Sequence, residues 1–430
     1  MGWILTILNI LLTLNVYIAA TVKYDGYKTY RLEPTERHHV RWLRDLKHAS
    51  ESKEIDFWSL PHHPHETVDI MVRPTSQAHL EKSLEQQQVP YNVIIGNVQD
   101  VIDGQHGSEE ETAPGQELFD YSRYHTYEEI QQWIEDFTAE NSHIADELLL
   151  TTSFEGRPIN GLRLGKKTSH RKAVYFQAGI HAREWISPAM LMYITKLLAE
   201  NYGRDNIVTR FLDNFDIYIV PLLNVDGYHY TWTQDRMWRK TRSVTPGNRC
   251  PGTDLNRNYG YKWGGEGAWH LSCSDVYCGP HPYSEPEING STTFLLNRNK
   301  TQDFVAFLDF HSYSQMLLSP WSYSASVTSP HDYADQMSAA SKMASALERV
   351  HGTKYEYGPS VTTLSAPASG CSQDWAYGIL GVKYAFIMEL RDLGDFGFLL
   401  PDNQIIPTGQ ETFAAVRALA AHLLHEYIQE

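Results

Sequence analysis

The segment between residues 173 and 202 constrains the fold more than any other part of the chain. Its first six residues, Ala173–Ala178, form a compact and mostly apolar run that predicts a buried strand, and residues 189–202 show the apolar periodicity of a helix. His181 and Glu184 lie in the turn between them. In open α/β sheets, sites are built at this edge, where the strands end. An imidazole and a carboxylate suit a zinc ion there, but a surface salt bridge or an ordinary helix-start carboxylate fits the pair equally well.

Strands and helices alternate along the chain from about residue 121. Apolar runs predict the strands, and apolar residues spaced three and four apart predict the helices. The further predicted strands are at 216–220, 304–310 and 382–389, and the further predicted helices are at 127–140, 285–297, 332–351 and 408–428. This order predicts an α/β domain over residues 121–430, with a mixed, mostly parallel twisted sheet and helices on both faces.

The first 120 residues divide into three segments. Residues 1–20 are apolar and end in two alanines, which predicts a signal peptide, although the missing basic start leaves a membrane anchor as the alternative. Residues 21–102 alternate strands, including 67–72 and 91–101, with helices, and so predict a small α+β open-sandwich domain. Residues 103–120 are rich in Gly, Glu and Pro, which is typical of a linker.

Charge and hydropathy limit the compartment and the partners. The 430 residues carry a formal net charge of −16 at pH 7, which argues against nucleic acid or an anionic membrane as a partner. No stretch after residue 20 approaches the roughly 18 consecutive apolar residues that span a bilayer. We therefore expect a secreted, extracellular protein, and the sequons at Asn289 and Asn299 are compatible with glycosylation there.

Four cysteines in a secreted chain predict two disulfides. Cys250 and Cys273 enclose a polar, Gly-rich segment and form one predicted pair. Cys278 and Cys371 are left as the second pair by elimination alone. A Cys-x4-Cys zinc site is the alternative for Cys273 and Cys278.

Two other predicted strands also end in side chains that carry chemistry. His311 directly follows the run 304–310, and Glu389 ends the run 382–389. A lone histidine is usually a packed polar residue, and Glu389 equally well pairs with Arg391. At the end of an apolar run, however, burial raises the pKa of a carboxyl group and suits it to general-base work.

The chain resembles the zinc metallocarboxypeptidases of the pancreatic A/B type, or procarboxypeptidases, over nearly its whole length. The resemblance depends on several motifs that occur in the family's order. Besides His181-x-x-Glu184, they are Trp238–Arg242 (WRKTR), Asp254–Asn258 (DLNRN), His311–Gln315 (HSYSQ), Glu389–Asp392 (ELRD), Gly397–Pro401 (GFLLP) and Gln404–Thr408 (QIIPT).

The resemblance implies a zymogen with one zinc ion per chain, a propeptide that inhibits it, and a protease that activates it. The implied zinc ligands are His181, Glu184 and His311. Glu389 is implied as the general base that activates water, and Arg239 as the cation that stabilises the oxyanion. Asp254 is implied as the carboxylate that orients His181. Asn256 and Arg257 are implied as the clamp for the substrate carboxylate, and Arg183 and Tyr313 as subsite residues.

The sequence departs from the family at two places that face the substrate. The family's mobile tyrosine is absent from residues 362–370, where Ser365 or Ala366 takes its place, so we expect a weaker cap and a raised KM. The residue at the base of the specificity pocket corresponds to Gln373. A neutral side chain there does not neutralise a lysine or arginine, and so favours neutral C-terminal residues.

The activation step is also unusual, because residues 83–122 contain no Lys or Arg and Arg123 is the first basic residue beyond them. Trypsin is therefore not expected to cut cleanly within residues 103–122. We expect a monomeric digestive enzyme. The alternative is a catalytically weakened homologue that binds peptide C-termini.

Overall fold

Three buried strands lie side by side and parallel at the centre of an eight-stranded sheet. They are β7 (Lys172–Ala178), β9 (Phe304–Ser312) and β12 (Tyr384–Leu390), and β9 pairs with both of the others. The strand order is β11-β10-β12-β9-β7-β8-β6-β5. The other strands are β5 (Ala145–Thr152), β6 (Pro158–Leu164), β8 (Phe215–Val220), β10 (Met316–Ser319) and β11 (Glu356–Pro359).

The pairing in this sheet is mixed. β7–β8, β7–β9, β9–β12 and β10–β11 are parallel, whereas β5–β6, β6–β8 and β10–β12 are antiparallel. The computed structural model describes residues 21–49, 54–59, 61, 63–105, 119–168, 172–327 and 329–428. The predicted signal peptide and most of the predicted linker therefore lie outside the described residues.

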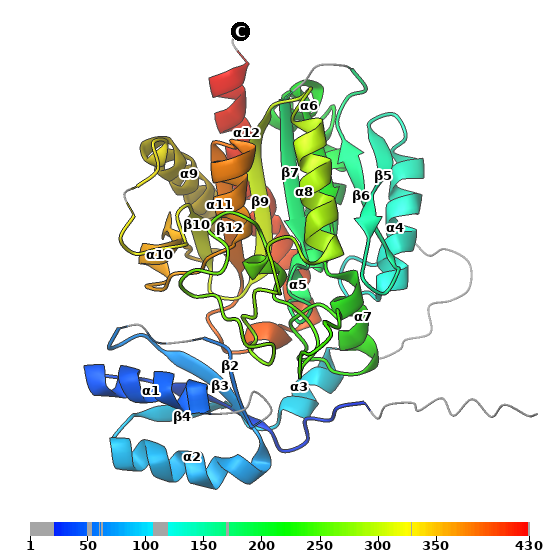
Figure 1. Cartoon of the computed structure of the whole chain (residues 1–430). Coiled ribbons are helices and arrows are strands. Elements are labelled where there is room, and N and C mark those ends of the chain that lie inside the picture. Colours follow the sequence, from blue (N-terminus) through cyan, green and yellow to red (C-terminus); the bar gives the residue numbers. More distant parts are fainter. Residues whose placement is uncertain are drawn as a thin grey trace, which may run out of the picture.

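Helices cover both faces of the large sheet, so the predicted fold class is confirmed (Figure 1). The helices α5 (Ile186–Asn201), α6 (Asn206–Asn214), α9 (Tyr333–His351) and α12 (Ile405–Tyr427) pack together on one face. The helix α8 (Pro286–Arg298) lies in front of the opposite face (Figure 1). The remaining α-helices of this domain are α4 (Tyr127–Glu140), α7 (Val225–Thr233), α10 (Ser360–Thr363) and α11 (Ser372–Trp375). In the described residues, no helix has both the length and the apolar character to cross a membrane.

The N-terminal domain contains a second, antiparallel sheet of four strands in the order β2-β3-β1-β4. Its elements are β1 (Lys28–Leu32), α1 (Arg37–Ala49), β2 (Ile55–Phe57), β3 (Val68–Val72), α2 (Pro74–Gln87), β4 (Tyr91–Ile95) and α3 (Val98–Gly104). The strand predicted over 91–101 is wrong beyond Ile95. The chain turns through Gly96 and Asn97 and begins α3, which buries Val98 and Ile102.

The N-terminal domain packs against the loops at the carboxyl ends of the central strands (Figure 1). Trp58 contacts the ring of Phe398 at a centroid distance of 5.3 Å and that of Tyr313 at 6.3 Å. Gln105 donates a hydrogen bond to the carbonyl of Leu400 (2.9 Å). The domain therefore lies over the sheet edge at which the sequence predicts the site.

One predicted disulfide is confirmed and the other is wrong. Cys250 and Cys273 are bonded, with their Cα atoms 4.9 Å apart. Cys278 and Cys371 are buried free thiols in different surroundings. Cys371 Sγ contacts the carbonyl oxygen of Asn256 (3.2 Å), whereas Cys278 Sγ lies 3.6 Å from His270 Nδ1. The pair was predicted only because these two cysteines were left over, which says nothing about the distance between them.

Candidate active site

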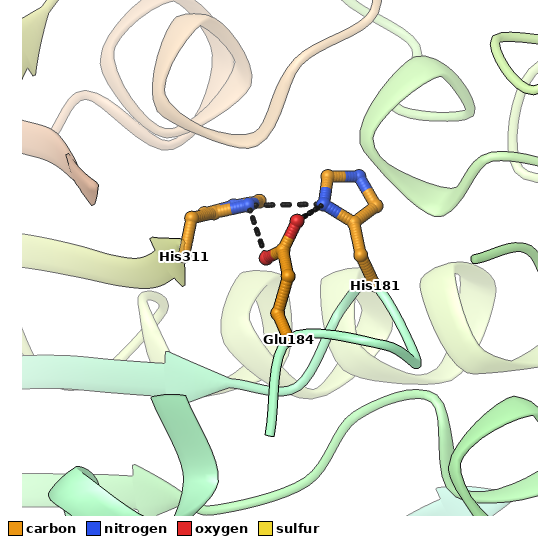
Figure 2. Close-up of side chains that lie close together, drawn as sticks. All are labelled: His181, Glu184 and His311. Atoms are coloured by element: carbon orange, nitrogen blue, oxygen red, sulfur yellow. Dashed lines mark hydrogen bonds and ion pairs between the residues drawn. The ribbon is translucent and has the colours of Figure 1, made fainter. Parts of the chain in front are cut away.

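The turn after β7 and the end of β9 bring two imidazoles and a carboxylate together (Figure 2). Glu184 Oε1 lies 2.7 Å from His181 Nδ1, and Glu184 Oε2 lies 3.2 Å from His311 Nδ1. The two Nδ1 atoms are 3.1 Å apart, and all three side chains are buried. Two nitrogen donors and one oxygen donor that converge in this way fit the three-ligand set of a catalytic zinc site, which leaves a fourth position open.

A glycine makes the turn at the end of β7 possible. Gly179 has a φ of +62°, and a Cβ atom there would lie 2.5 Å from the side chain of Leu222. Only glycine adopts this conformation without strain. The turn carries His181 and Glu184 back to the strand edge, where His311 ends the neighbouring strand.

Asp254 and Arg239 hold the His181 side of the site. Asp254 Oδ1 lies 3.1 Å from His181 Nε2, and Asp254 Oδ2 accepts a hydrogen bond from Arg239 (2.9 Å). Burial alone would raise the pKa of Asp254, but Arg239 and His181 outweigh it and hold that pKa well below its usual range. Arg239 also reaches within 3.7 Å of Glu184, and its Nε has no hydrogen-bond partner among the described residues.

Glu389 lies opposite His311 in the β9–β12 pairing. Burial raises the pKa of Glu389 to about 8, and the nearby charge of Glu184 adds to this effect while His311 opposes it. A divalent cation on the ligand triad would lower that pKa again. The site thus contains a carboxyl group poised near neutral pH beside the predicted metal ligands.

Asn256 and Arg257 occupy the short helix η1 (Leu255–Arg257), two and three residues after Asp254. Arg257 donates to the carbonyls of Asn256 (2.8 Å) and Gly267 (3.0 Å), which fixes its guanidinium. Asn256 Oδ1 accepts a hydrogen bond from the backbone N–H of Ser372 (2.9 Å). The predicted carboxylate clamp is therefore rigidly supported on the side of the site that carries Ser372.

The N-terminal domain engages the two predicted subsite residues. Arg183 donates a hydrogen bond to Asp56 Oδ2 (2.8 Å), and Tyr313 donates one to Asp69 Oδ2 (2.9 Å). Arg31 of the same domain pairs with Asp69 through two hydrogen bonds, of 2.8 and 3.0 Å. Both subsite residues are thus held by carboxylates of β2 and β3.

Gln373 lies buried at the start of α11. Its Nε2 donates to Ser360 Oγ (3.0 Å), while its Oε1 has no hydrogen-bond partner among the described residues. The neighbouring Asp374 accepts hydrogen bonds from Ser322 and Tyr323, and burial raises its pKa to about 7. In the loop where the family has its tyrosine, Ser365 adopts a φ of +56°.

Asp309 was missed by sequence reasoning. Its Oδ2 lies 3.1 Å from His311 Nε2 and accepts a hydrogen bond from Ser372 Oγ (2.5 Å). The signal was present, because an aspartate two residues before His311 interrupts an otherwise apolar strand and shares its face. The apolar neighbours of Asp309 make the whole run look like an ordinary buried strand.

Two family models match the chain in the order of its two sheets. The model described as carboxypeptidase activation peptide matches residues 30–105, and the model described as zinc carboxypeptidase matches residues 130–415. The chain belongs to the zinc carboxypeptidase family. The cofactor predicted for this carboxypeptidase, zinc, is confirmed, and so is its class as an exopeptidase zymogen with an activation peptide.

Relatives match this carboxypeptidase over nearly its whole length. It is 39% identical over 405 residues to carboxypeptidase B of Homo sapiens, and the matched region covers 93% of this chain and 94% of the relative. It is 39% identical over 412 residues to carboxypeptidase A2 of Rattus norvegicus, with coverages of 95% and 96%. The crystal structure of thrombin activatable fibrinolysis inhibitor matches it with a TM-score of 0.85 at 35% identity, over 93% of this chain and all of the other.

Proposed function

We propose that this carboxypeptidase is secreted as a zymogen for digestive proteolysis and removes neutral residues from the C-termini of peptides. The observation that carries the proposal is the joint placement of a zinc ligand set, a carboxyl group of raised pKa and a supported arginine at one strand edge. His181, Glu184 and His311 are the proposed ligands. When bound, zinc supplies a Lewis acid that polarises the scissile carbonyl and makes water more acidic.

Each of the remaining side chains has its own role in the reaction. Arg257 and Asn256 bind the terminal carboxylate of the peptide, and this charge-assisted contact contributes roughly 1.5–3 kcal/mol. Glu389 takes a proton from the attacking water and then passes it to the leaving amine. Arg239 stabilises the negative charge that develops on the carbonyl oxygen, and its Nε, which has no hydrogen-bond partner in the described part of the chain, is a donor for it.

Gln373 supports the proposed preference for neutral C-terminal residues. A lysine or arginine side chain in this pocket would be buried against an amide, which does not offset the loss of its hydration. By the resemblance to the family, Leu318, Ser322, Ser360 and Ile387 also line this pocket; all four are buried and none carries a charge. Overall similarity does not decide the question, because relatives named carboxypeptidase B and carboxypeptidase A2 are equally identical to this chain.

The proposed inhibition by the propeptide uses the contacts of Asp56 and Asp69. These carboxylates occupy Arg183 and Tyr313, which are the proposed subsite residues, so a peptide and the propeptide compete for them. Cleavage near the junction of the two domains is needed for release. Arg123 is the first basic residue there, is half-exposed, and donates a hydrogen bond to Glu129 (2.6 Å).

Peptidase assays on the activated enzyme test the proposal. After proteolytic removal of the propeptide, turnover is measured on blocked dipeptides that end in Phe, Leu, Gln, Lys or Glu, with and without a zinc chelator. We expect chelator-sensitive turnover that favours the three neutral residues, and turnover about 10²–10⁴-fold slower in a Glu389→Gln control. Preference for Lys would overturn the specificity, and tight binding of peptides without turnover would support the alternative of a C-terminus-binding protein.

A further inference from the structure

Asp309 is a fully buried carboxylate in the central strand of the protein. It lies in β9, whose nine residues are all buried, two residues before the proposed zinc ligand His311. In a strand, residues two apart point to the same face. Asp309 has no ion pair with a lysine or arginine in the described part of the chain. Burial of a carboxylate without a basic partner is costly, so its retention calls for a specific partner.

The partner that the structure offers is the far side of the His311 ring. Asp309 Oδ2 lies 3.1 Å from His311 Nε2, an ion-pair distance without the alignment of a full hydrogen bond. Elsewhere among the described residues, His311 Nε2 has no hydrogen-bond partner. Nδ1 of the same ring faces Glu184 and His181. The ring therefore lies between the ligand centre and the carboxylate of Asp309.

The arrangement repeats the one on the other histidine. His181 also turns Nδ1 toward the ligand centre and Nε2 toward a carboxylate, that of Asp254, at 3.1 Å. A carboxylate on the second nitrogen fixes the tautomer and the orientation of a metal-ligating imidazole. We propose that Asp309 is a positioning residue of the metal centre, which holds His311 with its proton on Nε2 and its Nδ1 free for zinc.

Ser372 extends this role toward the substrate. Its hydroxyl donates to Asp309 Oδ2 (2.5 Å), and its backbone N–H donates to Asn256 Oδ1 (2.9 Å). One residue thus anchors the carboxylate behind a proposed zinc ligand and one half of the proposed carboxylate clamp. The proposal rests on the ligand set and the clamp proposed above.

The test measures zinc binding directly in the intact zymogen. Competition with a chromophoric chelator gives the zinc affinity of the parent, Asp309→Asn and Ser372→Ala, and thermal unfolding is followed with and without zinc. We expect Asp309→Asn to bind zinc roughly 10–100-fold more weakly. Ser372→Ala should show a smaller loss of zinc affinity and, once activated, a higher KM with little change in kcat.

Glu287→Gln is the matched control. Glu287 is another buried carboxylate, but it lies in α8 and accepts a hydrogen bond from the backbone N–H of Phe154 (3.0 Å), away from the ligands. This variant should keep the zinc affinity of the parent within about twofold, since it changes a buried carboxylate that touches no ligand.

A merely structural role for Asp309 predicts a different pattern. Asp309→Asn would then lower the stability of the metal-free and the zinc-loaded protein equally and keep the parent's zinc affinity, which would overturn the proposal. If Asp309→Asn does not fold, unchanged zinc affinity in Ser372→Ala overturns it instead. Because zinc affinity is read without substrate, these outcomes stay distinct from a failure of the proposed peptidase specificity.

Discussion

At the scale of single residues, the site gives each buried carboxylate a different environment. Glu184 lies between two imidazoles, which hold its pKa well below the usual range against the opposing effect of burial. Asp254 lies against Arg239, and burial dominates at Glu389, which raises its pKa to about 8. The same functional group can therefore serve as ligand, orienting group and base within one site.

The proposed role of Glu389 as the general base predicts how its replacement by glutamine changes kcat. Glu389→Gln keeps the shape of the side chain but does not accept a proton from water, so kcat should fall by about 10²–10⁴-fold. Zinc content should stay at one ion per chain. Steady-state kinetics with a metal assay check both, and a kcat within tenfold of the parent would mean that another group is the base.

The loop without a tyrosine offers a second residue-scale prediction. Ala366→Tyr should lower KM for peptides several-fold, because an aromatic ring at this position restores a cap over the bound residue. Ser365→Tyr is the comparison: Ser365 has a φ of +56°, a conformation in which a bulky side chain is a clear outlier. Ala366→Tyr should therefore be the more stable variant, and unchanged peptidase kinetics in both would refute the missing cap.

The ligand residues and Asp254, which supports His181, could be predicted from the sequence, but the support of His311 could not. His181, Glu184 and His311 follow strands whose burial is visible as apolar runs. Asp309 sits inside such a run, and nothing in the sequence says which atom of His311 faces it. The Cys278–Cys371 pair was wrong for a related reason, because a disulfide depends on a distance and elimination contains none.

At the scale of elements, the central strands were predictable because they are buried on both faces, whereas the edge strands were not. β5, in which only Ala145 is buried and the other residues are partly or fully exposed, lacks a continuous apolar run. The short strands β10 and β11 were missed for another reason, because four residues are too few to show the period of a strand. Ligand positions depend on the central strands, so these omissions did not affect the site.

Asp56, in strand β2 of the N-terminal domain, offers a way to weaken latency, which is the inactivity of the uncleaved zymogen. Asp56→Ala removes the partner of Arg183 and of the Trp58 indole, and breaking such a buried pair costs about 3–5 kcal/mol. Activity of the uncleaved zymogen should therefore rise by about 100-fold or more. Asp45→Ala, at an exposed position of α1, is the control and should leave latency unchanged. Equal activity in both variants would contradict the proposed inhibition.

The Cys250–Cys273 loop is the second element with a measurable consequence. This disulfide spans 23 residues and encloses Asp254, Asn256 and Arg257. The paired change to serine should lower the free energy of unfolding by about 3 kcal/mol and raise KM more than it lowers kcat. Cys278→Ala, which removes a free thiol, serves as the comparison. Chemical unfolding and peptide kinetics check the two effects, and an unchanged KM would separate the loop from substrate binding.

At the scale of the whole molecule, stability should depend on pH through a buried acid far from the site. Burial raises the pKa of Glu287 to about 8, above its ordinary value of 4.5 in the unfolded chain. The folded state then holds a proton that the unfolded state has lost. The free energy of unfolding contributed by this group is therefore fully present below pH 4.5 and falls as pH rises toward 8.

Replacement of Glu287 tests this pH dependence of the free energy of unfolding. Glu287→Gln should flatten the decline in stability between pH 5 and 8, by up to a few kcal/mol at the upper end. Urea unfolding of the parent and the variant at several pH values measures it. A parent curve that rises over this range, or a variant curve parallel to the parent, would contradict the assignment of this decline to Glu287.

Arg183 and Tyr313 bind the N-terminal domain, and under the proposed function they also bind the substrate. A substitution that retunes either residue for a new peptide also changes how firmly the inactive form is closed. Evolution of substrate range at these positions is thus coupled to evolution of latency, and compensating changes are expected at Asp56 and Asp69. Gln373, the proposed base of the pocket, has no hydrogen bond or ion pair with the N-terminal domain among the described residues, and is free of that coupling.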